Sequence, residues 1–343
     1  MKVSIIGTTG YGGAELLRIL QRHPEFHIQS IHSTKEDIPI WTEYPHLYDI
    51  IDHNLQNINT SKIAESSDIV FLATPSGISG KLAAEFVNED MTAIDLSGDL
   101  RLPADTYETW YKHEPVNTEL YERAVYGLSE WYKEEIKGAK LIANPGCYPT
   151  AALLGLAPVV KEKLINPSSI IIDAKSGVSG AGRSLTRNTS FAEANENLRV
   201  YKVNEHQHTP EIESQLLKWN EQINPITFTT HLLPITRGIM TTAYVQVPEE
   251  LNTAQVLELY KETYKDKPFI RIRPESHYPS IKEVSGSNYC DIGLHVDSRT
   301  GRLTIVTVID NLMKGAAGQA VQNANIICGF NETTGLDFIP MYP

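Results

Sequence analysis

The stretch that decides the fold lies at the N-terminus, where residues 2–13 read KVSIIGTTGYGG. Its β-branched start predicts a buried strand at Lys2–Ile6, and an amphipathic helix is predicted at Ala14–Arg22. The loop between them has the spacing G-x-x-G-x-x-G, which permits a tight turn and lets a pyrophosphate approach backbone N–H groups. Such a loop alone also fits ordinary turn chemistry, but its place after the first strand favours a dinucleotide site. The predicted cofactor contacts are Gly7, Thr8, Thr9, Gly10, Tyr11, Gly12 and Gly13.

Strand and helix patterns then alternate through the first third of the chain. Further strands are predicted at 28–32, 68–73, 92–96 and 140–143, and a helix is predicted at 79–88. This alternation indicates right-handed βαβ units, and therefore an α/β fold with a doubly wound parallel Rossmann sheet.

After Pro145 the pattern becomes that of an α+β domain. Helices are predicted at 148–163 and 253–264, and strands at 169–175, 227–233, 241–247, 293–297 and 303–309. Most of these strands alternate apolar and polar residues, which is typical of a mostly antiparallel, half-exposed sheet. A last helix is predicted at 314–327. We expect a cofactor domain at 1–147, completed by 312–343, and a catalytic, substrate-binding and oligomerisation domain at 148–311.

Length and composition support this division and exclude several classes of function. A chain of 343 residues exceeds the usual size of one hydrophobic core. Its net charge of −12 opposes binding to a nucleic-acid backbone. The chain has no apolar run long enough for a membrane span, and residues 1–7 do not read as a signal peptide, so we expect a cytoplasmic protein without a membrane partner. Three cysteines without metal-ligand spacing predict neither a disulfide framework nor a metal site.

The end of the second predicted strand indicates the type of dinucleotide. An acidic residue usually meets the free ribose 2′-hydroxyl of NAD at this point. Here the chain has Ser33, Thr34 and Lys35, which suit a 2′-phosphate, so NADP is favoured over NAD. The alternative is that Lys35 is an ordinary solvated loop residue.

A candidate nucleophile lies in the segment NPGCYPT at 144–150. Cys147 follows a Pro-Gly turn beyond a predicted strand and begins a predicted helix. The positive end of a helix dipole favours the thiolate form of such a cysteine. A packing role is the alternative, but this position favours a nucleophile.

Two histidines and three arginines are further candidates. A thiolate that attacks a carbonyl needs a nearby acid or base, which His206 or His208 can supply. Both can instead be surface residues, or metal ligands together with Glu211 or His231. Arginine binds carboxylate or phosphate through two hydrogen bonds, although each arginine here also fits a structural ion pair. The three candidates are Arg101, Arg183 and Arg237.

Together these segments resemble the N-acetyl-gamma-glutamyl-phosphate reductase family over essentially the whole chain. The resemblance rests on LIANPGCYPTA at 141–151 with GLAP at 155–158, and on the glycine loop at 7–13. It also rests on the segments at 95–102, 179–183, 206–211, 231–238 and 311–320. Gly98 stands where alanine is more usual. Aspartate-semialdehyde dehydrogenase and phosphorylating glyceraldehyde-3-phosphate dehydrogenase share the cysteine chemistry but not the segment HQHTPE.

The resemblance implies a specific reaction. NADPH reduces N-acetyl-gamma-glutamyl phosphate to N-acetylglutamate 5-semialdehyde, with release of inorganic phosphate, through a thioester on Cys147 in arginine biosynthesis. His208 would be the acid/base and His206 a substrate contact, or the reverse. The other implied cofactor contacts are Thr74, Pro75, Ser179, Gly180, Asn311 and Gly315.

The resemblance also implies how the substrate and other copies of the chain are bound. The implied substrate contacts are Arg101, Arg183, Arg237 and Asn144, and a homodimer or homotetramer would form through the sheet of the second domain. One alternative is aspartate-semialdehyde dehydrogenase activity on a shorter acyl phosphate. Another is a non-catalytic NADP sensor, which is disfavoured because a sensor needs neither Cys147 nor the histidine pair.

Overall fold

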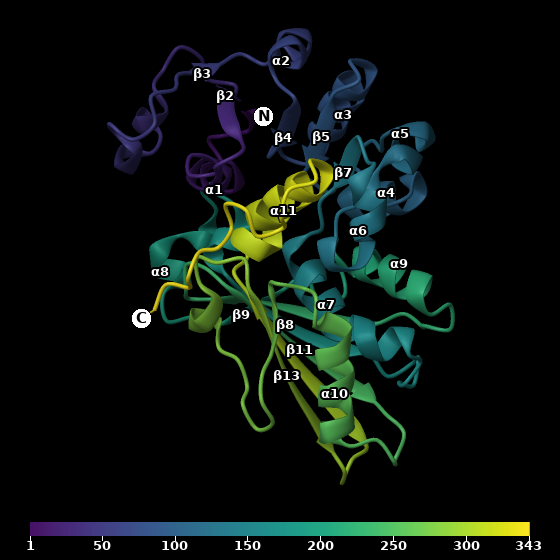
Figure 1. The fold of residues 1–343 in the computed structure, drawn as a ribbon. Coiled ribbons are helices and arrows are strands. Elements are labelled where there is room, and N and C mark those ends of the chain that lie inside the picture. Colours follow the sequence, from purple (N-terminus) through teal and green to yellow (C-terminus); the bar gives the residue numbers. More distant parts are fainter. Residues whose placement is uncertain (343) are drawn as a thin grey trace. The chain divides into compact units, whose positions relative to one another are not determined.

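The chain folds into two compact units in a computed structural model that describes residues 1–342. The first unit consists of Met1–Pro145 and Ala316–Asp337. The second unit consists of Gly146–Gly315 and the tail that begins at Phe338. The elements of both units are labelled in Figure 1.

The first unit is built on a seven-stranded sheet in the order β3-β2-β1-β4-β5-β7-β6. All its strands pair in parallel, as the sequence predicts. The chain leaves β1 toward β2 and β3 and returns on the other side at β4, so the topological switch point lies between β1 and β4. Parallel sheets bind ligands at the carboxyl ends of the strands at such a point. The strands are β1 Lys2–Ile6, β2 His27–His32, β3 Leu55–Gln56, β4 Ile69–Leu72, β5 Thr92–Asp95, β6 Val125–Tyr126 and β7 Leu141–Ala143.

Helices surround this sheet. Helix α3 packs on β4 and β5, and α1 packs on β1 and β2. The C-terminal helix α11 packs against α1 and α6 (Figure 1). The apolar runs in β4 and β5 are wholly buried because both faces of the sheet are covered. The helices are α1 Tyr11–Leu20, α2 Thr60–Ser66, α3 Ser79–Asn88, α4 Ala104–Tyr111, α5 Thr118–Arg123, α6 Ser129–Lys137 and α11 Gly318–Ile327.

The second unit contains a mixed sheet in the order β12-β13-β14-β11-β8-β10-β9. Four of its six neighbouring pairs are antiparallel, which confirms a mostly antiparallel sheet. The pairs β8–β10 and β12–β13 are parallel. The strands are β8 Ile171–Gly177, β9 Arg199–Tyr201, β10 Thr227–Leu233, β11 Ile239–Gln246, β12 Ile270–Ile272, β13 Cys290–Asp297 and β14 Arg302–Ile309.

Two helices, α7 and α10, pack on this sheet, and a third, α9, packs on α7. Helix α7 packs on β11 and β14, α9 packs on α7, and α10 packs on β12 and β13. Residues along β11 are alternately buried and half-buried, so the other face of the sheet is more open. The helices are α7 Cys147–Lys161, α8 Phe191–Ala194, α9 Thr209–Trp219 and α10 Thr253–Tyr264.

The structure also corrects some predicted boundaries. The first helix begins at Tyr11 rather than Ala14, since Gly10 already serves as its N-cap. The first residues of the helix predicted at 314–327 form a π-helical turn, Met313–Ala317, before α11 begins. Among the described residues, no helix is both long and apolar enough to cross a lipid bilayer.

Candidate active site

The glycine loop of the first unit lies at the switch point, directly after β1. Gly7 has a φ of +90°, and a Cβ there would lie 2.4 Å from the carbonyl oxygen of Ala73. A Cβ on Gly13 would lie 2.5 Å from the carbonyl oxygen of Gly7. The fold itself therefore requires these two glycines.

The other glycines of the loop have no such packing reason. A Cβ on Gly10 would meet its nearest atom at 3.6 Å, and one on Gly12 at 4.0 Å. The loop is held from outside by the Tyr44 hydroxyl, which donates to the carbonyl oxygens of Thr9 and Gly10 at 2.8 and 3.0 Å. The first N–H groups of α1 have no acceptor within the helix. Such N–H groups at a helix N-terminus are suited to bind a pyrophosphate.

A second observation at the switch point also fits a dinucleotide. Thr74 follows β4, and its Oγ1 is buried without a hydrogen-bond partner among residues 1–342. A buried hydroxyl without a partner costs free energy unless a ligand or water satisfies it. Pro75 beside it is exposed.

The loop predicted to recognise a 2′-phosphate is tightly organised. The Ser33 hydroxyl accepts from the Lys35 N–H at 3.0 Å and donates to the Lys35 carbonyl oxygen at 2.9 Å. Thr34 is exposed. The Lys35 ammonium, about half exposed, forms an ion pair with Glu43 at 2.5 Å. Lys35 therefore lies in the predicted loop, but its positive charge is partly neutralised by the carboxylate of Glu43.

Two predicted substrate contacts, Arg101 and Asn144, form hydrogen bonds to backbone groups of the first unit. The guanidinium of Arg101 is buried and donates to the carbonyl oxygens of Leu96 and Asn144, both at 2.8 Å. The side chain of Asn144 is fully buried, donates to the Ala316 carbonyl oxygen at 3.1 Å and accepts from Asn323 at 3.1 Å. These contacts join the ends of β5 and β7.

In the second unit, Cys147 is the first residue of α7, with Gly146 as N-cap. The Gly146 N–H donates to Glu211 Oε1 at 2.8 Å, and Glu211 is fully buried in the first turn of α9. Gly315 lies against the cysteine, because a Cβ at 315 would be 2.8 Å from the Cβ of Cys147. Glu211 thus fixes the residue before the cysteine, and Gly315 lies beside the cysteine side chain.

His206 and His208 lie beside Tyr148, the residue that follows Cys147. The ring centroids of His206 and His208 are 5.5 and 6.0 Å from that of Tyr148, and 4.7 Å from each other. The backbone N–H of His208 donates to His206 Nδ1 at 3.1 Å. Burial, and secondarily the charge of Lys202, lowers the pKa of His206 to about 3. His206 is therefore a neutral acceptor near neutral pH.

Three further predicted cofactor contacts of the second unit, Ser179, Gly180 and Asn311, are held by neighbouring residues. Asn311 is buried, accepts from the Gly238 N–H at 2.7 Å and donates to Ser179 Oγ at 3.0 Å. Gly180 leaves room for Ser176, whose Oγ would lie 2.6 Å from a Cβ at position 180.

Of the two arginines predicted in this unit, Arg237 forms an ion pair with the buried Asp310 at 3.3 Å. Arg183 is exposed.

Sequence reasoning missed the structural role of three residues. Glu211 entered only as a possible metal ligand, yet it fixes the N-cap before Cys147. Tyr148 and Tyr201 form a hydroxyl pair at 3.1 Å next to the histidines, and burial raises the pKa of Tyr201 to about 12. Because Glu211 lies three residues after His208 in one motif, a helical spacing could have suggested a shared site.

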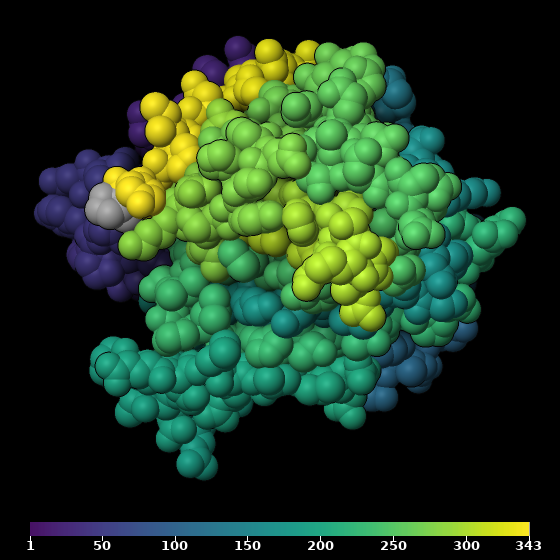
Figure 2. Space-filling view, turned by 90° about the horizontal axis from the view of Figure 1, so that it is seen from below, coloured from purple at the N-terminus to yellow at the C-terminus, as the bar shows by residue number. Residues whose placement is uncertain are grey.

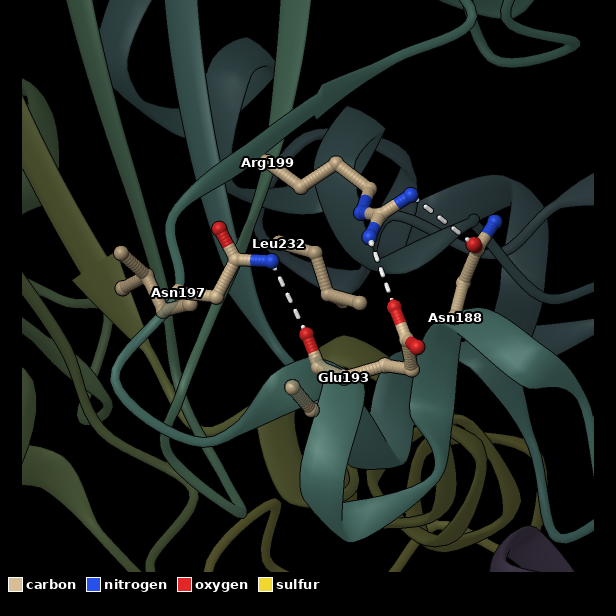
Figure 3. A pocket seen from close by; sticks show the side chains of 7 residues that line it. Asn188, Glu193, Asn197, Arg199 and Leu232 are labelled. Atoms are coloured by element: carbon tan, nitrogen blue, oxygen red, sulfur yellow. Dashed lines mark hydrogen bonds and ion pairs between the residues drawn. The ribbon is translucent and has the colours of Figure 1, made fainter.

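Other groupings in the second unit do not form a site. His231 pairs with Asp173 at 3.1 Å, and the described residues contain no cluster of histidine, cysteine or acidic side chains that could hold a metal. Figure 3 shows a small surface hollow in which Arg199 bonds to Asn188 and pairs with Glu193. None of the predicted site residues lines it.

Comparison with known proteins identifies the family. Residues 2–139 match the semialdehyde dehydrogenase NAD binding domain, and residues 147–311 match the semialdehyde dehydrogenase dimerisation domain. The chain is 54% identical to N-acetyl-gamma-glutamyl-phosphate reductase from Geobacillus sp. (strain WCH70) and 55% identical to that from Bacillus mycoides (strain KBAB4), with 100% of each chain covered.

Solved structures with the same fold have much lower sequence identity. Aspartate semialdehyde dehydrogenase II from Vibrio cholerae superposes with a TM-score of 0.73 at 19% identity, covering 96% of this chain and 98% of that one. The aspartate semialdehyde dehydrogenase with NADP from Candida albicans gives 0.67 at 17% identity, covering 95% and 98%. The sequence relatives carry the finer assignment, and the chain belongs to the N-acetyl-gamma-glutamyl-phosphate reductases within the semialdehyde dehydrogenase family.

Proposed function

We propose that this protein reduces N-acetyl-gamma-glutamyl phosphate to N-acetylglutamate 5-semialdehyde with NADPH and releases inorganic phosphate, as a step of arginine biosynthesis. The observation that carries the proposal is Cys147 at the N-terminus of α7, with Gly146 fixed by Glu211 and a histidine pair around Tyr148. Full-length relatives with this activity in their names support the choice of substrate.

The chemistry begins with the thiolate of Cys147, which attacks the acyl carbon of the substrate. The bond between that carbon and the phosphate oxygen breaks, inorganic phosphate leaves, and the acyl group remains on Sγ as a thioester. When bound, the nicotinamide supplies the hydride that reduces this acyl group. Collapse of the resulting thiohemiacetal releases the aldehyde and restores the Cys147 thiolate.

The two histidines have different roles in this proposal. His208 protonates the oxygen that becomes negative during reduction and takes the proton back when the thiohemiacetal collapses. His206 stays neutral, because its pKa is lowered to about 3, and its Nδ1 accepts the His208 N–H. His206 therefore positions the segment that carries His208, and we propose that it also contacts the substrate.

NADP is the cofactor we propose for the first unit. Its support is the absence of an acidic residue at 33–35, the lysine at position 35, and the open N-terminus of α1 with the unsatisfied Thr74 hydroxyl. The glycine loop would hold the pyrophosphate, and Ser33 with Lys35 would face the 2′-phosphate. We propose that Ser179, Gly180, Asn311 and Gly315 serve the nicotinamide end.

For the substrate, Arg183 and Arg237 are the proposed cations for its carboxylate and phosphate. Arg101 and Asn144 are proposed to act through the backbone that they hold, given their hydrogen bonds.

We further propose a cytoplasmic homo-oligomer that forms through the sheet of the second unit. The region that matches the dimerisation domain includes the whole sheet, whose β11 is half-buried at every second residue. The segment before β9, teal in Figure 2, stands out from the rest of this unit and carries Leu185, Phe191 and Leu198, all exposed. Light scattering after gel filtration tests the oligomer, and a monomer at all concentrations would disprove it.

A two-substrate assay tests the reaction. The purified protein, with phosphate and NADP, is offered N-acetylglutamate 5-semialdehyde or aspartate semialdehyde, and NADPH formation is followed at 340 nm. We expect turnover with the former only. Turnover only with aspartate semialdehyde would assign the other substrate, and binding of NADPH without turnover would indicate a sensor.

A further inference from the structure

The strongest unassigned cluster lies in the first unit, where the turn after β4 meets the turn after β5. We propose that Asp99 is a positioning residue that fixes the loop at 74–80 and thereby sets the affinity for NADPH. This inference rests on the proposed cofactor site, because the same loop carries Thr74 and Pro75. Asp99 itself is not expected to touch the cofactor.

Asp99 caps the N-terminus of α3, although it lies about 20 residues further along the chain. Its two carboxylate oxygens lie 2.9 Å from the Gly77 N, and Oδ2 lies 2.8 Å from the Gly80 N. The N-cap residue of α3, Ile78, offers no side-chain hydrogen bond. A buried carboxylate that accepts backbone N–H groups at a helix N-terminus forms strong, charge-assisted bonds.

The close approach of Asp99 needs glycines in the loop. A Cβ on Gly80 would lie 3.1 Å from the Cβ of Asp99 and 2.4 Å from Val116. Gly77 has a φ of +87°, which side chains rarely adopt. The two glycines thus allow the loop to approach the carboxylate of Asp99 closely.

A second set of bonds connects the same two turns. The Gly98 N–H donates to Ser76 Oγ at 3.2 Å, and the Ser79 hydroxyl donates to Asp95 at 2.5 Å. Asp95 also accepts from the N–H of Ser97 at 2.8 Å. Ser76, Gly77, Ser79 and Gly80 are therefore all hydrogen-bonded to the end of β5 or the turn after it, while the buried hydroxyl of Thr74 stays available for a ligand.

One of two stacked tyrosines donates a hydrogen bond to the Asp99 carboxylate. The Tyr107 hydroxyl donates to Asp99 Oδ1 at 2.7 Å, and its ring stacks on Tyr111 at 4.7 Å with an angle of 11°. A Cβ on Gly98 would lie 2.2 Å from the ring of Tyr111. The glycine at position 98 leaves room for the tyrosine.

The decisive variant is Asp99→Asn in the full-length protein. Its amide keeps the shape but removes the negative charge, so the bonds from the N–H groups of Gly77 and Gly80 are no longer charge-assisted. We expect the Kd for NADPH, measured by the change in nicotinamide fluorescence on binding, to rise about tenfold. The KM for NADPH should rise in parallel, while kcat at saturating NADPH changes less than about threefold.

A direct readout of the loop separates this inference from the proposed reaction. Hydrogen exchange followed by mass spectrometry should show faster exchange of the peptide covering 74–82 in Asp99→Asn. A peptide from β11 serves as the internal reference. If the wild-type protein lacked the proposed reaction, the Kd and the exchange rates would still test Asp99.

Two further variants keep the test valid if Asp99→Asn folds poorly. Tyr107→Phe removes one hydrogen bond to Asp99 and should raise the Kd for NADPH about two- to threefold. Asp105→Asn changes an exposed acid at the start of α4 and should leave Kd, KM and exchange at their wild-type values. An unchanged Kd and unchanged exchange at 74–82 in both Asp99→Asn and Tyr107→Phe would overturn the proposal.

Discussion

The N-termini of α1 and α3 lie after neighbouring strands of one sheet, yet among the described residues only that of α3 has a side-chain hydrogen-bond acceptor from the protein. Helix α1 begins after Gly10, which offers no side chain to cap it. Helix α3 is closed by the buried carboxylate of Asp99. Both helices present the same backbone donors. An N-terminus without its own acceptor can bind a ligand, whereas one with its own carboxylate holds the loop beside it in place.

The N-terminus of α7 is a third case, since it carries a reactive side chain. We predict that Cys147→Ala loses turnover to below detection, at least about 10³-fold, because no thioester can form. Cys147→Ser should also fail, since an alkoxide forms less readily than a thiolate. NADPH binding, measured by fluorescence, should be unchanged in both.

Iodoacetamide labelling adds a check on the same residue. Cys147 should react faster than Cys290, which is buried, and Cys328, whose pKa is raised to about 11 by burial. Substrate should protect Cys147. Near wild-type turnover in Cys147→Ala would mean that hydride reaches the substrate without a thioester.

The histidine pair is expected to have the next largest effect. His208→Asn should lower kcat by about 10²- to 10⁴-fold without loss of NADPH binding, because it removes the acid/base. His206→Asn should mainly raise the KM for the acyl phosphate. Steady-state kinetics with both variants decide between them. The opposite pattern would exchange their roles, and no effect in either would remove both from the mechanism.

The open N-terminus of α1 can be tested with two matched glycine variants. Gly10→Ala adds a methyl group that the fold can accommodate but that occupies the proposed pyrophosphate position, so the Kd for NADPH should rise about tenfold with an unchanged Tm. Gly13→Ala should lower Tm, because its methyl group overlaps the Gly7 carbonyl. Equal Tm losses, with no change in Kd for Gly10→Ala, would contradict a ligand role for this loop.

Cofactor choice is tested at the end of β2. Ser33→Asp places a negative charge beside the proposed 2′-phosphate, so the KM for NADPH should rise about tenfold through like-charge repulsion. The KM for NADH should fall or stay constant. Equal use of NADH and NADPH by the wild-type protein would contradict the interpretation of this loop.

The smallest predicted effect concerns pH and stability. The pKa of His206 is about 3 in the folded protein and 6.5 for an ordinary solvated histidine, so the unfolded chain takes up a proton first as pH falls. Stability from this residue is complete above pH 6.5 and decreases below it, by about 1.4 kcal/mol at pH 5.5. Urea unfolding at pH 7.5 and 5.5 should show this loss in the wild type but not in His206→Gln. The exposed His27→Gln is the control, and an equal loss in all three would contradict the assignment.

Local patterns predicted the fold well where one segment contains the whole signal. The strand–glycine–helix pattern at 2–20 and the mostly antiparallel second sheet are both confirmed. The strands β3 and β6 escaped prediction because two residues carry no periodicity. Helix α9 was missed because its polar first turn reads as a histidine motif rather than as a helix.

The candidate site shows the same division between local and distant information. A cysteine after a Pro-Gly turn signals its position at a helix N-terminus without help from the rest of the chain. The partners of Arg101 and Asp99 lie up to 43 residues away, so their burial and hydrogen bonds follow from tertiary packing that no local pattern reveals. Arginine in a loop after a strand fits a substrate contact and a backbone clamp equally well.

The contact between Gly98 and Tyr111 has a consequence for how the sequence can change. With Tyr111 present, Gly98→Ala places its methyl carbon 2.2 Å from Cζ and from the hydroxyl oxygen of Tyr111, so the tyrosine would have to move. With Gly98 present, truncation of Tyr111 removes the ring that stacks on Tyr107. Gly98→Ala therefore requires a displaced Tyr111, whereas a chain with alanine at 98 and a smaller residue at 111 would not have this overlap. The effect of a substitution at position 98 thus depends on which residue stands at 111, so the two positions are epistatic.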